Sequence, residues 1–282
     1  MDQLFIALQH LLPQHLLSRL VGWLARSELP FIRGPFIRLF ASHFEVDMSE
    51  AAEPELEAYP SFNAFFTRAL AEGARPLADG EDALLCPADG SISQLGSIDG
   101  GRIFQAKGHS YSCAELLSDP ERARAYENGS FATVYLSPRD YHRVHMPCAG
   151  DLSAQTYVPG ALFSVNQTTA ENVDRLFARN ERLVCYFDTP TGPMAMVLVG
   201  AMIVAGIETV WSGQVAPPPR QPKTVDYKNA PPGISLARGE EMGRFLLGST
   251  VILLFPKNTV TWEPGFSAGS PTRMGERLGT FT

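Results

Sequence analysis

The chain has 282 residues, of which 45% are hydrophobic and 19% charged, so it can bury a large core and is too apolar for a disordered protein. Its formal net charge of −7 argues against a nucleic-acid partner, which requires a basic face. The four cysteines include no CxxC pair and no histidine at zinc-finger spacing, a pattern that favours buried thiols in a reducing compartment.

The first 44 residues predict helices with one apolar face. Apolar residues recur there at three-to-four spacing, Pro13 interrupts the run, and another apolar segment follows Pro30. Four arginines against Asp2 and Glu28 give this segment a charge of +2, which leaves −9 for the remainder. Such helices either lie in the interface of an anionic membrane or cap the core of the body, and the pattern alone does not choose.

The same segment bears on where the protein works. No apolar run reaches the roughly 20 residues that span a bilayer. The N-terminus has no cationic start and carries Asp2, which argues against a secretory signal. We therefore expect a protein on the cytoplasmic side of the membrane.

The rest of the chain changes from helix to strand. A second helical segment is predicted between 59 and 76, with Phe62, Phe65, Phe66 and Leu70 on one side. From about residue 83, short β-prone runs alternate with turn residues, at 90–95, 131–136, 182–187, 194–204, 207–211 and 245–255. The proline-rich stretch 217–222 predicts an exposed, extended connection. This order predicts an α+β protein, with N-terminal amphipathic helices followed by a mostly antiparallel β-rich core.

The run 245–255 contains the first candidate for chemistry. Gly248, Ser249 and Thr250 interrupt an otherwise apolar strand pattern. Glycine inside a strand often marks a bulge or a close backbone approach, so the triplet alone indicates no more than a kink. A catalytic role for Ser249 requires a base nearby.

Candidate bases lie in the segment 137–147, which holds two of the six histidines, His142 and His145, with Asp140 close by. Histidine is a natural general base because its ordinary pKa is about 6.5. The same residues could be metal ligands or surface histidines at a strand end. Asp89, just before Gly90, either ends a turn or holds a histidine in one tautomer.

Together these segments resemble the bacterial-type phosphatidylserine decarboxylase family. The resemblance extends from about residue 60 to about residue 260 in the correct order. The matching segments are FNAFFTR (62–68), PADG (87–90), SPRDYHRVHMP (137–147), LFSVN (162–166), NER (180–182) and LGST (247–250). The segment LGST is specific for this family only because it follows the histidine-bearing segment 137–147. The N-terminal helices resemble those of the family only in their general character and not in their residues.

The resemblance implies a chain that cuts itself. Ser249 would attack the carbonyl of Gly248, and the chain would separate into a β chain, 1–248, and an α chain, 249–282. Asp89, His145 and Ser249 would form the charge-relay set for this cleavage. Ser249 would become an N-terminal pyruvoyl group, and no metal is expected.

The resemblance also implies the reaction. The pyruvoyl group would form a Schiff base with phosphatidylserine and convert it to phosphatidylethanolamine and CO₂. His142 would protonate the carbon that loses CO₂, with Asp140 as a second residue that tunes it. Residues 1–50 would associate with the cytoplasmic face of an anionic membrane as a peripheral segment, and 51–282 would be the catalytic domain. The cleaved chains would remain together as an αβ heterodimer; whether such heterodimers pair further is open.

Three other functions remain possible on the residues alone. A membrane-associated serine hydrolase or lipase could use Ser249, His145 and Asp89 without cleavage, although the sequence lacks the G-x-S-x-G elbow. A non-enzymatic membrane-binding protein would need Gly248–Thr250 only as a kink. A metal-dependent protein would use His142 and His145 as ligands. None of the three explains why the motifs occur together and in this order.

Overall fold

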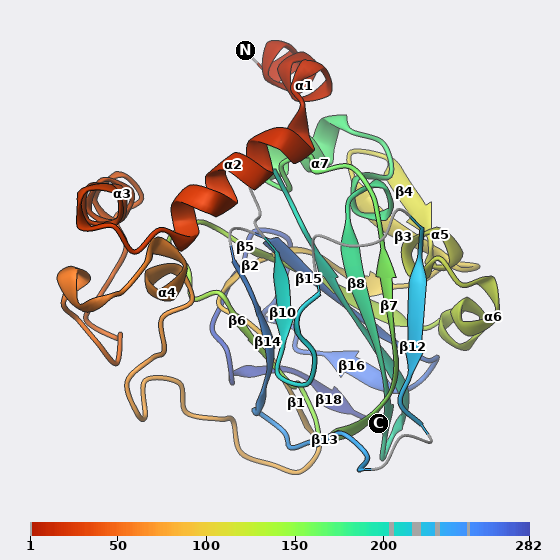
Figure 1. The fold of residues 1–282 in the computed structure, drawn as a ribbon. Coiled ribbons are helices and arrows are strands. Elements are labelled where there is room, and N and C mark those ends of the chain that lie inside the picture. The colour runs from red at the N-terminus through yellow and green to blue at the C-terminus, as the bar shows by residue number, and fades with distance from the viewer. Residues whose placement is uncertain (1, 203–205, 216–220, 229–231, 247–248) are drawn as a thin grey trace.

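The computed structural model places three helices against one side of a β-rich body (Figure 1). It describes residues 2–202, 206–215, 221–228, 232–246 and 249–282. The three helices are α1 (Asp2–Leu11), α2 (Gln14–Arg26) and α3 (Pro30–His43). Proline separates or begins them, since Pro13 precedes α2 and Pro30 opens α3, a position where its missing N–H costs nothing. Most of the proline-rich stretch 217–222 lies outside the described residues.

The body is built on one antiparallel sheet, so the predicted α+β class is confirmed. The strand order is β12-β7-β8-β9-β15-β5-β2-β17, with β13 paired to β7. The strands are β2 (Gly90–Ser97), β5 (Ser130–Leu136), β7 (Gly150–Val158), β8 (Arg182–Thr189), β9 (Gly192–Val199), β12 (Lys223–Asp226), β13 (Ser235–Leu236), β15 (Ser249–Phe255) and β17 (Pro271–Thr272). Alternate residues of β15 enter two different hydrophobic cores: Ile252 and Leu254 on one face, Val251 and Leu253 on the other. Both faces of the sheet are therefore buried, which is why β15 reads as a continuous apolar run.

Different elements cover the two faces. Helices contribute to the core that contains Ile252, namely α4 (Phe62–Phe66), α5 (Cys113–Leu117), α6 (Pro120–Ala123), α7 (Gln167–Asn172) and α8 (Leu176–Arg179). The same core also receives residues from two 3-10 turns, Leu56–Ala58 and Arg124–Tyr126, and from the hairpin of β3 (Arg102–Ala106) and β4 (His109–Ser112). Two small sheets contribute to the core that contains Leu253. The first consists of β1 (Ala83–Leu85), β18 (Arg277–Phe281) and β16 (Val260–Trp262). The second consists of β11 (Gly213–Gln214), β10 (Ile207–Thr209), β14 (Glu241–Phe245) and β6 (Arg143–His145). The result is three layers with the long sheet in the middle.

Three predicted elements were wrong in extent, and one of them, the strand expected over 194–204, is β9, which ends at Val199. The helix expected between 59 and 76 is only α4, which Ser61 caps by accepting from the Ala64 N–H, and the chain after it pairs Leu70 with Ala51. The predicted strand 245–255 is two strands, because β14 ends at Phe245 in a small sheet and β15 begins at Ser249 in the long one. The interruption by small residues thus marks a change of sheet.

The N-terminal helices have two different faces. Small residues of α2, Ser18, Gly22 and Ala25, are buried, and Phe36 of α3 stacks on Phe62 with ring centroids 4.1 Å apart. Ten of the thirteen exposed large hydrophobic residues in the described chain lie between residues 5 and 39: Phe5, Leu8, Leu11, Leu12, Leu16, Leu20, Trp23, Leu29, Phe31 and Leu39. The helices therefore cap the body with one face and leave a broad apolar face open. Among the described helices, none combines the length and the hydropathy that a bilayer span requires.

Gly90 is required for the close packing of β2 on β5. Its φ is +152°, and a Cβ placed on it would lie 2.1 Å from the carbonyl oxygen of Tyr135. Gly96 of the same strand has a similar φ of +157°, but a Cβ there would meet nothing within 4 Å. The two glycines differ in their surroundings and not in their backbone conformation.

We expect Gly90→Ala to destabilise the fold more than Gly96→Ala. Gly96→Ala should cost about 1–3 kcal/mol for its unfavourable φ alone. Gly90→Ala should cost about 1–3 kcal/mol more, because β2 and β5 must also separate. Urea unfolding followed by tryptophan fluorescence measures both losses, and equal losses would contradict the steric argument.

Candidate active site

Strand register brings the residues singled out in the sequence to one end of the long sheet. Ser249, the first residue of β15, pairs with Leu136, the last residue of β5, after which the histidine-bearing segment begins. On the other side of β5, Ser91 pairs with Tyr135, so Asp89 enters β2 at the same end. Gly248 and the side chain of Ser249 lie outside the described residues.

His145 is held as a neutral base. Its backbone N–H donates to the Pro87 carbonyl at 2.9 Å, and its ring Nδ1 lies 2.9 Å from the carbonyl oxygen of Gly239. A carbonyl only accepts, so Nδ1 carries the proton and Nε2 has a free lone pair. The Tyr141 hydroxyl lies 2.9 Å from Nε2 and donates to it. Burial lowers the pKa of His145, which favours this neutral tautomer.

Asp89 binds an arginine that the sequence analysis did not single out. Its buried carboxylate accepts from Arg75 through both oxygens, with Nε 3.0 Å from Oδ1, and from the Met274 N–H at 2.8 Å. Arg75 also pairs with Glu50 at 2.7 Å, and its pKa is raised by these bonds. In the described part of the chain, Asp89 does not hydrogen-bond His145. It acts on His145 through its charge, which raises the pKa of the ring, while Gly239 fixes the tautomer.

His142 is fully buried and lies against an aromatic ring. Its imidazole stacks on Phe66, with centroids 3.9 Å apart and the planes 21° from parallel. Burial, assisted by the charge of Arg68, lowers the pKa of His142 to about 3. The nearby carbonyls of Ser137 and Pro138 favour the protonated ring, but neither ring nitrogen has a well-aligned hydrogen-bond partner among the described residues. His142 is therefore neutral in this structure.

Asp140 closes a turn. Its Oδ2 accepts from the Ser137 N–H at 2.6 Å, and its own N–H donates to the Ser137 carbonyl at 3.0 Å. Burial raises the pKa of its carboxyl group. The turn is also fixed by Arg68, whose Nη2 donates to the Arg139 carbonyl at 3.1 Å. Among the described contacts Asp140 shapes the segment before His142 and does not touch the ring.

A cavity of 350 Å³ opens beside these residues. It is lined by Glu45, Asp47, Glu50, Arg68, Leu70, Arg75, Asp89, Gly90, Arg139, Asp140, Tyr141, Pro271, Thr272 and Arg273. The lining carries charges of both signs. Sequence reasoning missed Arg68, Arg75 and Tyr141, although Arg68 and Tyr141 belong to the segments that carry the resemblance.

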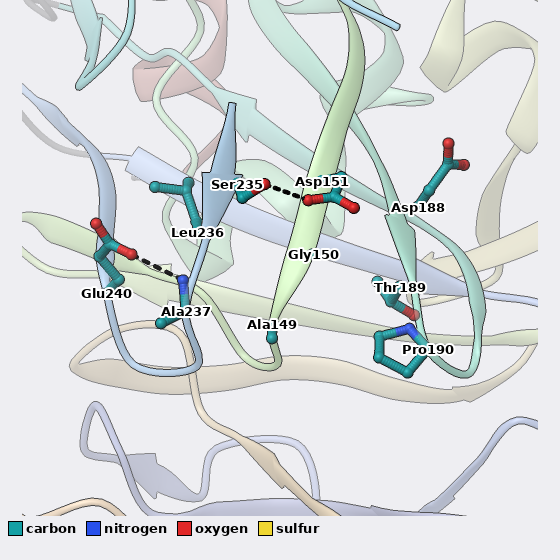
Figure 2. Close-up of a pocket in the computed structure, with 10 residues that line it drawn as sticks. All are labelled: Ala149, Gly150, Asp151, Asp188, Thr189, Pro190, Ser235, Leu236, Ala237 and Glu240. Carbon is teal, nitrogen blue, oxygen red and sulfur yellow. Dashed lines mark hydrogen bonds between the residues drawn. The ribbon is translucent and has the colours of Figure 1, made fainter. Parts of the chain in front are cut away.

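A second, larger depression of 700 Å³ lies at the opposite end of the sheet, where β7 begins and β8 ends (Figure 2). It carries Asp151, Asp188 and Glu240. Asp151 accepts from the Ser235 hydroxyl, and Glu240 accepts from the Ala237 N–H at 2.7 Å. None of the residues predicted to be catalytic lines it. Within the described residues, no three His, Cys, Asp or Glu side chains are grouped as metal ligands.

Comparison with known proteins adds to this geometry. A family model described as phosphatidylserine decarboxylase matches residues 62–280, and one described as PSD matches residues 4–45. Proteins named phosphatidylserine decarboxylase proenzyme are similar along nearly the whole chain. The protein from Pseudomonas aeruginosa (strain LESB58) is 62% identical over 98% of this chain and 96% of its own length. The protein from Alcanivorax borkumensis is 58% identical over 100% of this chain and 97% of its own length.

The low pKa of His142 predicts a pH-dependent stability. The folded-state pKa of about 3 lies below the ordinary value of 6.5, so the unfolded chain takes up the proton first as pH falls. The contribution of this residue is complete above about pH 6.5 and is lost progressively down to pH 3. His142→Leu should therefore show a shallower fall in unfolding free energy over this range than the unsubstituted chain, as measured by urea unfolding at each pH. Parallel curves would show that His142 takes up a proton in the folded state as readily as in the unfolded one.

Proposed function

The chain belongs to the phosphatidylserine decarboxylase family, and we propose that it carries out this decarboxylation after cutting itself between Gly248 and Ser249. The observation that carries the proposal is the position of Ser249. It begins β15 beside the end of β5, from which the segment with His142 and His145 continues. The similar proteins are named proenzymes, a name that fits a chain made as a precursor.

The cleavage needs a nucleophile and a base. The hydroxyl oxygen of Ser249 attacks the carbonyl carbon of Gly248 while its proton passes to His145, and the peptide bond becomes an ester. Removal of the α-proton of Ser249 then expels the Gly248 carboxylate and leaves dehydroalanine, which water converts to pyruvoyl and ammonia. His145 suits the role because Gly239 holds its proton on Nδ1 and leaves Nε2 to accept. The products are the β chain, 1–248, and the α chain, 249–282, retained as an αβ heterodimer.

The residues around the cleavage point fit the group that results. A pyruvoyl group supplies a keto function that takes up the amine of the substrate and accepts the electrons left by CO₂. His142 is our candidate to protonate the carbon that loses CO₂. In this structure its ring is neutral and only weakly basic, so it needs an anion nearby to favour the imidazolium form. The carboxylate or phosphodiester of the lipid provides that anion.

The cavity also suits the substrate headgroup. Phosphatidylserine carries an ammonium group and two anionic groups, and the lining carries both acidic and basic side chains. Arg68 has no acidic partner in the described chain, and its Nε and Nη1 atoms donate to no group. Its guanidinium group, which forms no ion pair in the described chain, favours a substrate with anionic groups.

We also propose that residues 1–50 hold the enzyme on the cytoplasmic face of the membrane, with 51–282 as the catalytic domain. The support is the open apolar face of α1–α3 and the charge of +2 on residues 1–44. A diacyl lipid leaves its bilayer reluctantly, because each buried CH₂ contributes about 0.8 kcal/mol. An enzyme that acts on its headgroup therefore has to come to the membrane.

The cleavage is tested by the intact masses of the chains under denaturing conditions, with and without borohydride. The unsubstituted protein should give two chains divided at Gly248–Ser249, the smaller with a reducible carbonyl. Ser249→Ala should stay at full length, and His145→Ala should stay at full length or cleave far more slowly. Ser130→Ala, which changes a serine at the far end of the β5–β15 pair, should cleave normally. A folded, active protein that remains one unmodified chain would instead favour the serine hydrolase.

Membrane binding is tested by vesicle sedimentation. Phe31, on α3, is 74% exposed, and Phe104, on β3, is 45% exposed at a distance from the N-terminal helices in sequence. Phe31→Ser should weaken binding to vesicles of phosphatidylserine and phosphatidylcholine by roughly 10- to 150-fold, because a buried Phe contributes roughly 1.5–3 kcal/mol. Phe104→Ser should bind as the unsubstituted protein does. Equal binding of both variants would mean that α1–α3 do not form the membrane surface.

A further inference from the structure

The hydroxyl of Tyr141 occupies the one atom of His145 that can take up a proton. Nδ1 already carries a hydrogen, which it donates to Gly239, so only Nε2 has a lone pair. The Tyr141 hydroxyl donates to that nitrogen over 2.9 Å. Both side chains are more than nine-tenths buried, so solvent does not readily replace this bond.

The cavity meets Tyr141 and not His145. Tyr141 lines the cavity together with Asp89 and Asp140, whereas His145 is not part of the lining. The histidine therefore lies behind the tyrosine as seen from the cavity. Because the tyrosine hydroxyl already binds Nε2, a proton that reaches this nitrogen from another group has to pass the hydroxyl or displace it.

We infer that Tyr141 relays protons between His145 and the reacting group in the self-cleavage, an inference that rests on the proposed function. The hydroxyl oxygen of Tyr141 accepts a proton from the reacting group as its own proton moves to Nε2 of His145. Tyr141 ends the step as a neutral phenol, His145 becomes an imidazolium ion, and the reacting oxygen gains the electron pair for its attack. The return step reverses both transfers, so no other reactant is consumed.

The charges around the pair suit a relay. Asp89, Arg143 and Glu241 act on both rings, and Arg244 acts on Tyr141 as well. Glu241 pairs with Arg143 and with Arg244, each at 2.8 Å, so these charges largely cancel. The Asp89 carboxylate also favours the imidazolium ion, although it is itself paired with Arg75. Burial raises the pKa of Tyr141 to about 12, so the phenol keeps a proton to donate at neutral pH.

The test follows cleavage of freshly synthesised full-length chain, made in a cell-free system, across pH 5–8. For Tyr141→Phe we expect the highest rate to fall roughly 100-fold, the size of a lost acid–base contribution. The pH of half-maximal rate should also rise, because the neutral ring loses a hydrogen bond to its acceptor nitrogen. Tyr59→Phe is the matched control: Tyr59 is 7% exposed against 6% for Tyr141, and its hydroxyl donates a hydrogen bond to the Glu53 carbonyl. Tyr59→Phe should cleave at the unsubstituted rate.

Other results would overturn the relay. If the maximal cleavage rate of Tyr141→Phe is unchanged, even with a shifted pH of half-maximal rate, Tyr141 only positions the His145 ring and relays no proton. A faster rate would show that the hydroxyl blocks Nε2.

A measurement on the unsubstituted chain does not depend on how a variant folds. Two protons move together in a relay, so a plot of the cleavage rate against the deuterium fraction of the solvent should be curved. A linear plot would overturn the proposal. Failure of the unsubstituted chain to cleave at all would count against the proposed function instead.

Discussion

The site depends on the hydrogen-bond register of three neighbouring strands. Residues near 89, 136 and 249 are far apart in sequence, and the antiparallel pairing of β2, β5 and β15 alone brings them to one end of the sheet. The register is strongly specified, because both faces of β15 are buried in different cores. A slip of one residue would move Ile252 and Leu253 each to the wrong core. The packing that stabilises the sheet therefore also fixes the position of Ser249.

Burial then decides which groups at that end are charged. Burial lowers the pKa of both His142 and His145, so that both are neutral, whereas Asp89 is paired with Arg75. A buried base with a fixed tautomer suits removal of a proton from serine. The proposed role of His142 in decarboxylation requires the opposite, a proton donor, and under that proposal an anion nearby would favour its protonated form. Under the proposed function, the same buried site would therefore favour self-cleavage when empty and catalysis when it holds an anionic substrate.

Sequence reasoning predicted the fold class and six of the β-prone runs because these follow from local patterns, but it did not predict β7, the nine-residue strand Gly150–Val158. The apolar run before Phe255 and the turn residues between strands report directly on burial and connectivity. It did not predict that Arg75 binds Asp89 or that Gly239 orients His145, because these contacts join residues 14 and 94 positions apart. Nothing in the local pattern of Arg75 or Gly239 distinguishes it from an ordinary loop residue. It extended the helix after Phe66 too far, since the pairing of Leu70 with Ala51 outweighs a helical pattern that is only local.

The N-terminal helices are attached to the body by specific hydrogen bonds as well as by apolar contact. The Gln9 side chain of α1 accepts from the Ser164 N–H at 2.8 Å, and that of Gln14 on α2 accepts from the Leu162 N–H at 2.7 Å. Asn180 joins this segment to the sheet by donating to the Phe163 and Gly200 carbonyls, and Gly200 directly follows Val199, which pairs with Thr250. Hydrogen bonds require fixed geometry, whereas an apolar contact alone would let the helices slide. The open apolar face of α1–α3 is therefore held at a fixed position relative to the end of the sheet where Ser249 lies, as an enzyme with a substrate embedded in a membrane requires.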